Sequence, residues 1–462
     1  MIDLSTLPAG RPYIVLGLGR SGRSAARALR ASGHKVWAWD DDLDTREAAR
    51  AEAIPIINLR NRDLSAVAGL VLSPGIPHRH PVPHPLVRHA QASGCQIVGD
   101  GELLALAQPG AKCVGITGTN GKSTTTALIG HVVAAAGRTC AVGGNLGTPV
   151  LALETLGADG IYVLEMSSYQ LELTPSLVFV VAVLLNVTPD HLDRHGGMNG
   201  YIAAKRQIFR RQGEGATAIV GVDDDVCRAI ADELDGHSDA RIVRISGRDT
   251  VAGGVYVRDG TLFDATISDA PRRVLDLSEA AALPGEHNAQ NAAAAYAAAR
   301  ALGLNVADIA AAIRTFPGLS HRQERIAIID GVAFVNDSKA TNADAAARAL
   351  ACYGQIFWIA GGRPKEGGLE AIRPYLARIR HAFLIGEAME GFAAWLDGQV
   401  AFTRCGTLQQ AVAAAAAAAR TAARRGDGNP VVLLSPACAS FDQFTSFEAR
   451  GQAFRNLVEA LQ

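Results

Sequence analysis

The sequence predicts an α/β protein of three domains whose sheets are mainly parallel. Its 462 residues suit about three domains at roughly 150 residues each. Two short apolar runs end in glycine-rich turns that precede helix-compatible segments, and other apolar runs end in single polar residues. Such runs are typical of strands in parallel sheets that helices cover on both faces. We expect the domains to span residues 1–100, 101–318 and 319–462.

The first block, residues 1–100, begins with a predicted strand over 12–16, a glycine turn over 17–22 and a helix over 21–31. A second strand over 35–39 ends at Asp40. A GxGxxG turn with an acid about twenty residues later suggests a dinucleotide site, but the same geometry holds any diphosphate. A further short strand over 70–72 ends in Ser73-Pro74-Gly75. The histidines at 78, 80 and 84 lie in a proline-rich run, which favours an irregular surface loop over a metal site.

The second block, residues 101–318, carries the strongest signal in the chain. An apolar run over 113–117 leads into Gly118-Thr119-Asn120-Gly121-Lys122-Ser123, and a helix-compatible segment follows. Backbone N–H groups and the helix dipole then face phosphate oxygens, the lysine adds charge, and the serine hydroxyl can hold Mg²⁺. The match to the general P-loop is imperfect, because Ile116 stands where that pattern has glycine. We predict a nucleoside triphosphate site, and an ordinary glycine-rich turn is the alternative.

Two further strands of this block end in polar residues. Residues 161–164 end at Glu165, and residues 178–185 end at Asn186, shortly before the segment 188–193. Ligands gather at the carboxyl ends of parallel strands, and a carboxylate there commonly holds the Mg²⁺ of a nucleotide. A plain strand-end acid is the alternative for Glu165. The polar, Gly/Asp-rich stretch 221–275 indicates little about function.

The third block, residues 319–462, begins with a predicted hairpin over 325–335 that turns at Asp330-Gly331. Strands are expected over 355–360, 382–385 and 431–434, with helices between them, and the alanine run 411–419 favours a packed helix. The loops 336–342 and 435–444 each follow a strand and are rich in small donors and acceptors. Such loops often carry binding groups, although helix capping is an equally good reading of any single residue.

Composition excludes several classes of protein. The net charge is −1 and no basic block occurs, which argues against nucleic acid as a partner. Seven scattered cysteines without a CxxC pair indicate a reducing compartment. No targeting signal and no apolar run of membrane-spanning length is present. We therefore expect a soluble cytoplasmic protein without membrane insertion.

Eight segments, read in order, resemble those of the Mur ligases over essentially the whole chain. They are GTNGKS, LEMSSYQL, LNVTPDHLDRH, YIAAK, GEHNAQN, HRQE, NDSKATN and SPACASFDQF. The last two resemble the branch that adds D-glutamate. The resemblance implies a Rossmann-like N-terminal domain for the UDP substrate, a central P-loop ATPase-type parallel sheet and a Rossmann-like C-terminal domain for the amino acid. It also implies a monomer that uses ATP to join D-glutamate to UDP-N-acetylmuramoyl-L-alanine through an acyl phosphate, in the cytoplasmic stage of peptidoglycan synthesis.

The resemblance also implies roles for individual residues. The catalytic residues would be Lys122, His191 and Lys205, and two Mg²⁺ ions would be held by Ser123, Glu165, His191 and Lys205 carried as a carbamate. From the sequence alone, Lys205 is better read as a solvated helix lysine. ATP would contact Gly118, Thr119, Asn120, Gly121, Lys122, Ser123, Thr124, Asn288, Asn291, Arg322 and Asp337. The UDP substrate would contact Gly19, Arg20, Ser21, Asp40, Ser73, Gly75 and Asn145. Glutamate would contact Lys339, Thr341, Lys365, Ser440 and Phe447.

Two stretches depart from the family pattern. Asp40-Asp41-Asp42 places three acids where a uridine diphosphate is expected, and family members can have threonine and arginine after the first acid. In GGRPKEGG, Lys365 aligns with the family lysine, but Arg363 could share its role.

Three other functions are compatible with parts of the sequence. A folylpolyglutamate-synthase-like ligase shares the ATP core, but the glycine-rich block ahead of the P-loop argues against it. A nucleotide-regulated binding protein would not explain Glu165, His191 and Lys205 together. A dinucleotide-dependent oxidoreductase lacks a hydride-transfer constellation.

Overall fold

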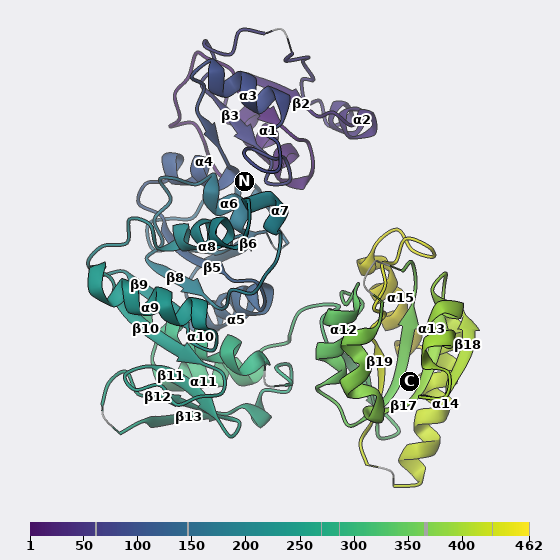
Figure 1. The fold of residues 1–462 in the computed structure, drawn as a ribbon. Coiled ribbons are helices and arrows are strands. Elements are labelled where there is room, and N and C mark those ends of the chain that lie inside the picture. The colour runs from purple at the N-terminus through teal and green to yellow at the C-terminus, as the bar shows by residue number, and fades with distance from the viewer. Residues whose placement is uncertain are drawn as a thin grey trace. The chain divides into compact units, whose positions relative to one another are not determined.

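The computed structural model describes residues 1–60, 62–145, 147–268, 270–285, 287–364, 368–426 and 428–461. They form two compact units (Figure 1). Unit 1 comprises Met1–Ala280 and Glu286–Phe316, and unit 2 comprises Ala281–Gly285 and Pro317–Gln462. Two sheets lie in unit 1 and one in unit 2, and parallel pairs predominate. The predicted α/β class is confirmed, while the domain limits at 100 and 318 stay a prediction.

The first sheet of unit 1 has four parallel strands in the order β2-β1-β3-β4. The strands are β1 (Tyr13–Leu16), β2 (Val36–Trp39), β3 (Gly69–Leu72) and β4 (Ile97–Val98), and the helices are α1 (Arg20–Ala31), α2 (Leu43–Ala51) and α3 (Pro85–Ala92). Because β2 and β3 lie on opposite sides of β1, the chain segments that follow β1 and β3 run in opposite directions from the carboxyl ends of these two strands. In open α/β sheets, a crevice for ligands forms at such a switch point.

A glycine turn joins β1 to α1. Gly17 has a φ of +87°, and a Cβ at Gly22 would lie 1.7 Å from the Gly17 carbonyl oxygen. The helix therefore packs directly on the turn, which only glycine at position 22 allows. Asp40, just past the end of β2, accepts a hydrogen bond from the Leu18 N–H at 2.6 Å and fixes the turn from the other side.

The second sheet of unit 1 has nine strands in the order β13-β12-β11-β10-β9-β8-β5-β7-β6. Pairing is parallel from β6 to β11 and antiparallel between β11, β12 and β13. The strands are β5 (Lys112–Thr117), β6 (Cys140–Gly144), β7 (Ile161–Glu165), β8 (Val181–Leu184), β9 (Thr217–Gly221), β10 (Arg241–Ser246), β11 (Val255–Arg258), β12 (Thr261–Asp264) and β13 (Arg272–Asp276).

Helices α5, α9, α10 and α11 pack on this second sheet, and further helices lie around it. The helices are α4 (Asp100–Ala107), α5 (Lys122–Ala135), α6 (Ser168–Glu172), α7 (Leu192–His195), α8 (Met198–Arg206), α9 (Asp225–His237), α10 (His287–Ala301) and α11 (Val306–Thr315), with 3-10 turns η1 (Val150–Ala152), η2 (Gln207–Phe209) and η3 (Leu277–Glu279). Strands β7 and β8 are buried along their whole length, as their continuous apolar runs predict.

Unit 2 has a six-stranded sheet in the order β14-β15-β19-β16-β17-β18. The predicted hairpin is confirmed: β14 and β15 pair antiparallel, and both Asp330 and Gly331 have positive φ, as a type I′ turn requires. The other strands are parallel. The elements are β14 (Glu324–Ile329), β15 (Val332–Asn336), α12 (Ala343–Leu350), β16 (Gln355–Gly361), η4 (Glu370–Arg378), β17 (Ile379–Ile385), α13 (Met389–Leu396), β18 (Phe402–Gly406), α14 (Leu408–Arg424), β19 (Pro430–Leu434) and α15 (Phe447–Glu459).

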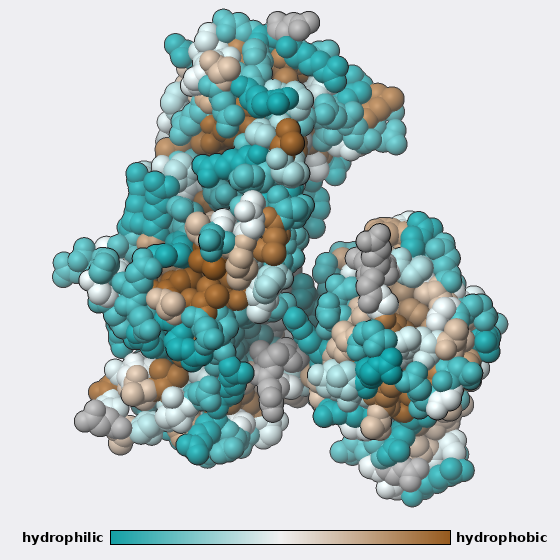
Figure 2. All heavy atoms as spheres, viewed as in Figure 1, coloured by the Kyte–Doolittle hydropathy of each residue, from teal (hydrophilic) through white to brown (hydrophobic). Residues whose placement is uncertain are grey.

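The visible surface is mostly hydrophilic, with smaller hydrophobic patches between (Figure 2). Within the described ranges, no helix is both long and apolar enough to cross a membrane. No disulfide joins the seven cysteines, all of which lie among the described residues.

Candidate functional site

The predicted phosphate loop lies between β5 and α5. Gly121 caps α5 in the left-handed conformation, with a φ of +83°, and a Cβ there would lie 2.3 Å from Asn291 Oδ1. Two constraints thus require glycine at this position. The first turn of α5 contains no acidic residue, so its N–H groups and dipole face the loop without an opposing charge on the helix.

A strand-end asparagine holds this loop in place. The Thr119 N–H donates to the Asn186 carbonyl oxygen at 2.9 Å, and the Asn120 N–H donates to Asn186 Oδ1 at 2.8 Å. Asn186 Nδ2 in turn donates to the Asn120 carbonyl oxygen at 3.2 Å. Sequence reasoning gave Asn186 no role, although its place directly after a buried strand was the available signal.

Helix α10 brings two predicted nucleotide-binding residues beside α5. Asn291 Oδ1 accepts a hydrogen bond from the Thr125 hydroxyl at 3.1 Å, and Asn291 Nδ2 donates to Asn288 Oδ1 at 3.0 Å. Both asparagines are buried. Gln290, which the sequence analysis did not single out, receives a hydrogen bond from Asn186 Nδ2 at 3.1 Å.

Two lysines converge on one carbonyl oxygen of the loop. Lys205 Nζ donates to the Gly118 oxygen at 2.7 Å, and Lys122 Nζ donates to the same oxygen at 2.9 Å. Lys205 is only 1% exposed, so the prediction of a solvated helix lysine is wrong. Its burial, with the charge of Lys122 as the second cause, lowers the pKa of Lys205 to about 7. The edge of the sheet therefore places the charge of Lys122 beside a lysine that gives up its proton more readily than an ordinary lysine.

The predicted carboxylate ligand lies at the neighbouring strand end. Glu165 pairs in register with Ile116 of β5 and is 2% exposed. Its Oε1 accepts a hydrogen bond from Asn145 Nδ2 at 2.7 Å. Its Oε2 is buried and has no hydrogen-bond partner in the described part of the chain. A buried carboxylate oxygen without a donor fits a cation, because its charge would otherwise remain uncompensated.

Counting only residues whose positions are described, His191 makes no hydrogen bond or ion pair with the phosphate loop, Lys205 or Glu165. It is half-exposed, precedes α7 with a φ of +50°, and its Nε2 lies 3.6 Å from Asp190 Oδ2. Among the residues that the structure describes, no group of three His, Cys, Asp or Glu side chains is arranged to hold a metal ion. Mg²⁺ at nucleotide sites commonly takes only one or two protein ligands, with phosphates and water supplying the rest.

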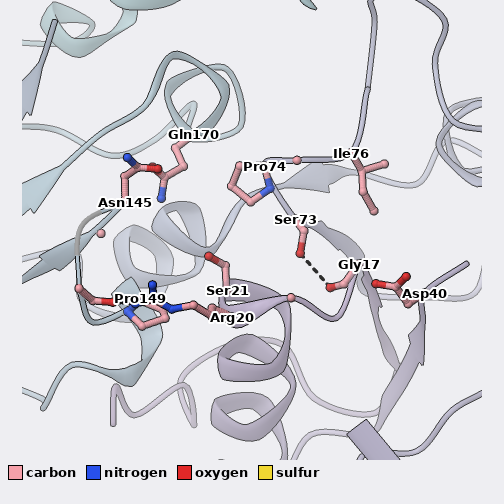
Figure 3. A pocket seen from close by; sticks show the side chains of 14 residues that line it. Gly17, Arg20, Ser21, Asp40, Ser73, Pro74, Ile76, Asn145, Pro149 and Gln170 are labelled. Carbon is pink, nitrogen blue, oxygen red and sulfur yellow. Dashed lines mark hydrogen bonds between the residues drawn. The ribbon is translucent and has the colours of Figure 1, made fainter. Parts of the chain in front are cut away.

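A cavity of about 430 Å³ lies between the two sheets of unit 1. Its wall includes every residue predicted to contact the UDP substrate: Gly19, Arg20, Ser21, Asp40, Ser73, Gly75 and Asn145. Figure 3 shows Asn145 and Gln170 facing the cavity from the side opposite Asp40 and Ser73. The Ser73 hydroxyl donates to the Gly17 carbonyl oxygen at 2.8 Å, which joins the turns after β1 and β3. The cavity therefore opens at the switch point of the first sheet.

The three consecutive acids have separate partners, and of the three only Asp40 lines the cavity. Asp41 accepts hydrogen bonds from His84 Nε2 and Trp39 Nε1, both at 2.9 Å, and these hold the pKa of Asp41 below its ordinary value. Asp42 caps α2 by accepting from the Thr45 N–H at 2.8 Å. Of the three carboxylates, only that of Asp40 would therefore lie beside a diphosphate bound in the cavity.

In unit 2, the loops 336–342 and 435–444 lie side by side. Lys339 Nζ lies 3.9 Å from the centre of the Phe447 ring, and Ser440 is buried. Asp337 accepts hydrogen bonds from the Ser435 hydroxyl at 2.8 Å and the Gln323 N–H at 3.2 Å.

The other predicted residues of unit 2 lie in these loops or near them in the sequence. The Arg322 N–H donates to the Leu319 carbonyl oxygen at 3.1 Å, and the Thr341 N–H donates to the Lys339 carbonyl oxygen at 2.8 Å. Burial raises the pKa of Asp337 to about 7, and the charge of Arg322 opposes this. Lys365 lies outside the described residues, while Arg363 pairs with Glu387 at 3.0 Å.

A buried arginine that the sequence analysis missed ties the two loops together. Arg450, 1% exposed, donates from Nε to the Ser338 hydroxyl at 3.0 Å and from one Nη to the carbonyl oxygens of Ser338 and Cys438 at 2.9 and 3.0 Å. Its other Nη donates to the Ala439 carbonyl oxygen at 3.3 Å. Burial lowers the pKa of Arg450 to about 10, so the side chain stays charged at neutral pH.

We predict that Arg450→Met lowers the free energy of unfolding by about 3 kcal/mol, because buried carbonyl oxygens on both loops lose their donor. Arg455→Met is the matched control on the same helix, since Arg455 makes only partly exposed ion pairs with Glu324 and Glu459 and should cost under about 1 kcal/mol. Urea unfolding of both variants measures the difference, and equal losses would contradict it.

Comparison with known proteins agrees with this geometry. Residues 116–299 match the family model of the Mur ligase middle domain. The chain is 54% identical to UDP-N-acetylmuramoylalanine--D-glutamate ligase of Paramagnetospirillum magneticum, over 98% of this chain and 97% of the relative. It is 54% identical to the protein of the same name from Rhodospirillum rubrum, over 98% and 95%.

Solved structures share the fold at low identity. UDP-N-acetylmuramate-alanine ligase from Thermotoga maritima matches with a TM-score of 0.59 and 16% identity, over 98% of this chain and 100% of that chain. UDP-N-acetylmuramoylalanyl-D-glutamyl-2,6-diaminopimelate--D-alanyl-D-alanyl ligase from Acinetobacter baumannii matches with a TM-score of 0.56 and 19% identity, over 99% and 92%. These two structures bear on the fold alone, and they agree with the predicted three-domain α/β class.

Proposed function

This chain belongs to the Mur ligase family, and on that basis we propose that it is an ATP-dependent amide ligase that adds D-glutamate to UDP-N-acetylmuramoyl-L-alanine. The reaction belongs to the cytoplasmic stage of peptidoglycan synthesis. The observation that carries the proposal is the convergence, within unit 1, of a glycine-rich phosphate loop, two lysines and a buried carboxylate oxygen that has no hydrogen-bond partner among the described residues, beside a separate cavity.

The chemistry explains why the reaction needs a nucleotide. A carboxylate does not react with an amine at neutral pH, because its leaving group would be oxide. When a carboxylate oxygen of the alanyl substrate attacks the γ-phosphorus of ATP, the bridging P–O bond breaks and ADP leaves. The glutamate nitrogen then attacks the acyl carbon of the acyl phosphate and loses a proton, and phosphate departs as the amide forms. Alignment of the reactants and neutralisation of their charges are what the protein must supply.

The phosphate loop supplies the first part of this stabilisation. The N–H groups at the start of α5 bind phosphate oxygens, with Lys122 as the cation for the terminal phosphates. The loop region includes the ATP contacts Gly118, Thr119, Asn120, Gly121, Ser123 and Thr124. Asn288 and Asn291 lie beside it on α10. The expected contributions of Arg322 and Asp337 would come from unit 2.

The donors near the loop suit Mg²⁺, which takes oxygen ligands. Glu165 Oε2, which is buried and accepts no hydrogen bond within the described ranges, would hold it together with the Ser123 hydroxyl, and His191 is the expected ligand of a second ion. Bound Mg²⁺ would neutralise the crowded phosphate charge. The protein residues orient the donors: Asn145 fixes Glu165 by its hydrogen bond to Oε1.

Lys205 suits this site only in a modified form. As an ammonium it would repel a divalent cation, whereas a carbamate is anionic and presents two oxygens. Its pKa of about 7 leaves a large neutral fraction above that pH, and the neutral amine nitrogen is the form that attacks CO₂ and releases a proton. We therefore propose that Lys205 carries a carbamate.

The cavity between the two sheets would take the UDP part of the acceptor, with the turns after β1 and β3 around the diphosphate. Glutamate, a dicarboxylate, needs cations and hydroxyl donors, and the loops of unit 2 carry Lys339, Thr341, Lys365 and Ser440 beside Phe447. We propose a monomer with these small-molecule partners. The chain matches relatives named UDP-N-acetylmuramoylalanine--D-glutamate ligase over nearly its whole length. This match disfavours the three alternatives: a folylpolyglutamate synthase, a non-catalytic binding protein and an oxidoreductase.

The reaction is tested by phosphate release from Mg·ATP. We expect release only when UDP-N-acetylmuramoyl-L-alanine and D-glutamate are both present, because the acyl phosphate needs the first and turnover needs the second. L-glutamate in place of D-glutamate is the matched control and should give little release. Release that needs neither acceptor, or that L-glutamate supports equally well, would contradict the proposal.

The carbamate is tested by chemical rescue. Lys205→Ala should lose at least about 100-fold in turnover, since an anionic ligand disappears from a charged site. Acetate or formate should restore part of it by placing a carboxylate in the space left behind. Lys122→Ala is the control that these acids should not rescue, because there a cation is missing. Equal rescue of both variants, or of neither, would overturn the carbamate.

A further inference from the structure

Helix α7 is a single turn that contacts α6. It runs between two residues in the left-handed conformation, His191 with a φ of +50° and Gly196 with a φ of +68°. His195 is buried, its Nε2 lies 2.9 Å from the Ser168 hydroxyl, and its ring stacks on Tyr169 with centroids 5.2 Å apart. The turn that begins at His191 is therefore anchored to α6.

An arginine of α7 also reaches the turn that follows β3 of the first sheet. Arg194 donates from one Nη to the Gly75 carbonyl oxygen at 2.9 Å and from the other to the Pro74 carbonyl oxygen at 3.4 Å. Its guanidinium lies 4.6 Å from the centre of the Tyr169 ring. A planar guanidinium can make these contacts together, whereas a lysine ammonium would supply a single point of contact.

The two carbonyl groups belong to the turn that forms one wall of the cavity. Ser73, Pro74 and Gly75 all line it, and the Ser73 hydroxyl connects this turn to Gly17. A second contact lies farther along the same loop, where His78 Nε2 is 3.8 Å from Glu172 Oε2 at the end of α6. The loop after β3 therefore rests on α6 and α7, and Arg194 makes the hydrogen bonds nearest the cavity.

We propose that Arg194 is a positioning residue that holds the Pro74–Gly75 turn in its ligand-binding place and links the UDP cavity to the helix that begins at His191. The inference rests on the proposed function, which assigns the cavity to the UDP part of the acceptor. Arg194 itself does not line the cavity. Its contribution is to fix backbone groups that do, through charge-assisted hydrogen bonds.

The test is calorimetric titration of the full-length chain with UDP and, separately, with Mg·ATP. Arg194→Met should raise the Kd for UDP about tenfold, as expected for the loss of a charge-assisted hydrogen bond, and leave the Kd for Mg·ATP unchanged. The Kd of Arg194→Lys for UDP should lie between those of the parental chain and Arg194→Met. Arg300→Met is the matched control, because half-buried Arg300 also donates to a backbone carbonyl, that of Leu304 at 2.6 Å, but does not line the cavity.

Steady-state kinetics gives a second readout. The KM for UDP-N-acetylmuramoyl-L-alanine should rise in Arg194→Met while the KM for ATP stays the same. A parental Kd for UDP in this variant, or equal weakening of UDP and Mg·ATP, would overturn the positioning role. UDP binding is measured without turnover, so failure of the phosphate-release assay and failure of the positioning role can be told apart. A parental chain that binds no UDP would overturn the assignment of the cavity to the UDP part of the acceptor.

Discussion

The site depends on the fact that parallel strands place their carboxyl ends at one edge of a sheet. Strands β5, β7 and β8 are neighbours in the central sheet, so the phosphate loop, Glu165 and Asn186 meet there although they are far apart in the sequence. Lys205 reaches the same edge from α8 and shares the Gly118 oxygen with Lys122. Burial beside the charge of Lys122 lowers the pKa of Lys205 to about 7, which favours the neutral amine that the proposed carbamate requires.

The cavity that we propose for the UDP part of the acceptor follows from the same rule, applied to the four-stranded first sheet. The turns after β1 and β3 diverge at the switch point, and residues after β6 and in α6 close the cavity from the central sheet. Asp40 shows how an acid can stay beside an expected diphosphate: it is engaged by the Leu18 N–H of the glycine turn. The two sheets of unit 1 thus line one cavity that neither forms alone.

The sequence predicted local features well. Both glycine turns, the buried strands that end in polar residues and the Asp330-Gly331 hairpin depend on backbone conformations that few residue types allow, so their composition is informative. The stretch 221–275 was not resolved into elements, because its strands β10 to β13 include exposed positions and lack continuous apolar runs. Asn186, Arg194 and Arg450 were given no role, since each acts through hydrogen bonds to distant backbone groups that no local pattern specifies. The burial of Lys205 was mispredicted for the same reason: only the fold places α8 against the loop.

The central claim is that the strand-end edge of unit 1 binds Mg·ATP independently of the UDP cavity. Titration of Gly121→Ala tests it most directly, because a Cβ there would lie 2.3 Å from Asn291 Oδ1 in a backbone conformation with a φ of +83°. The account predicts that the parental chain binds both Mg·ATP and UDP, and that the variant loses Mg·ATP while keeping the parental Kd for UDP. A variant that binds Mg·ATP as tightly as the parental chain, or a parental chain that binds none, would contradict it.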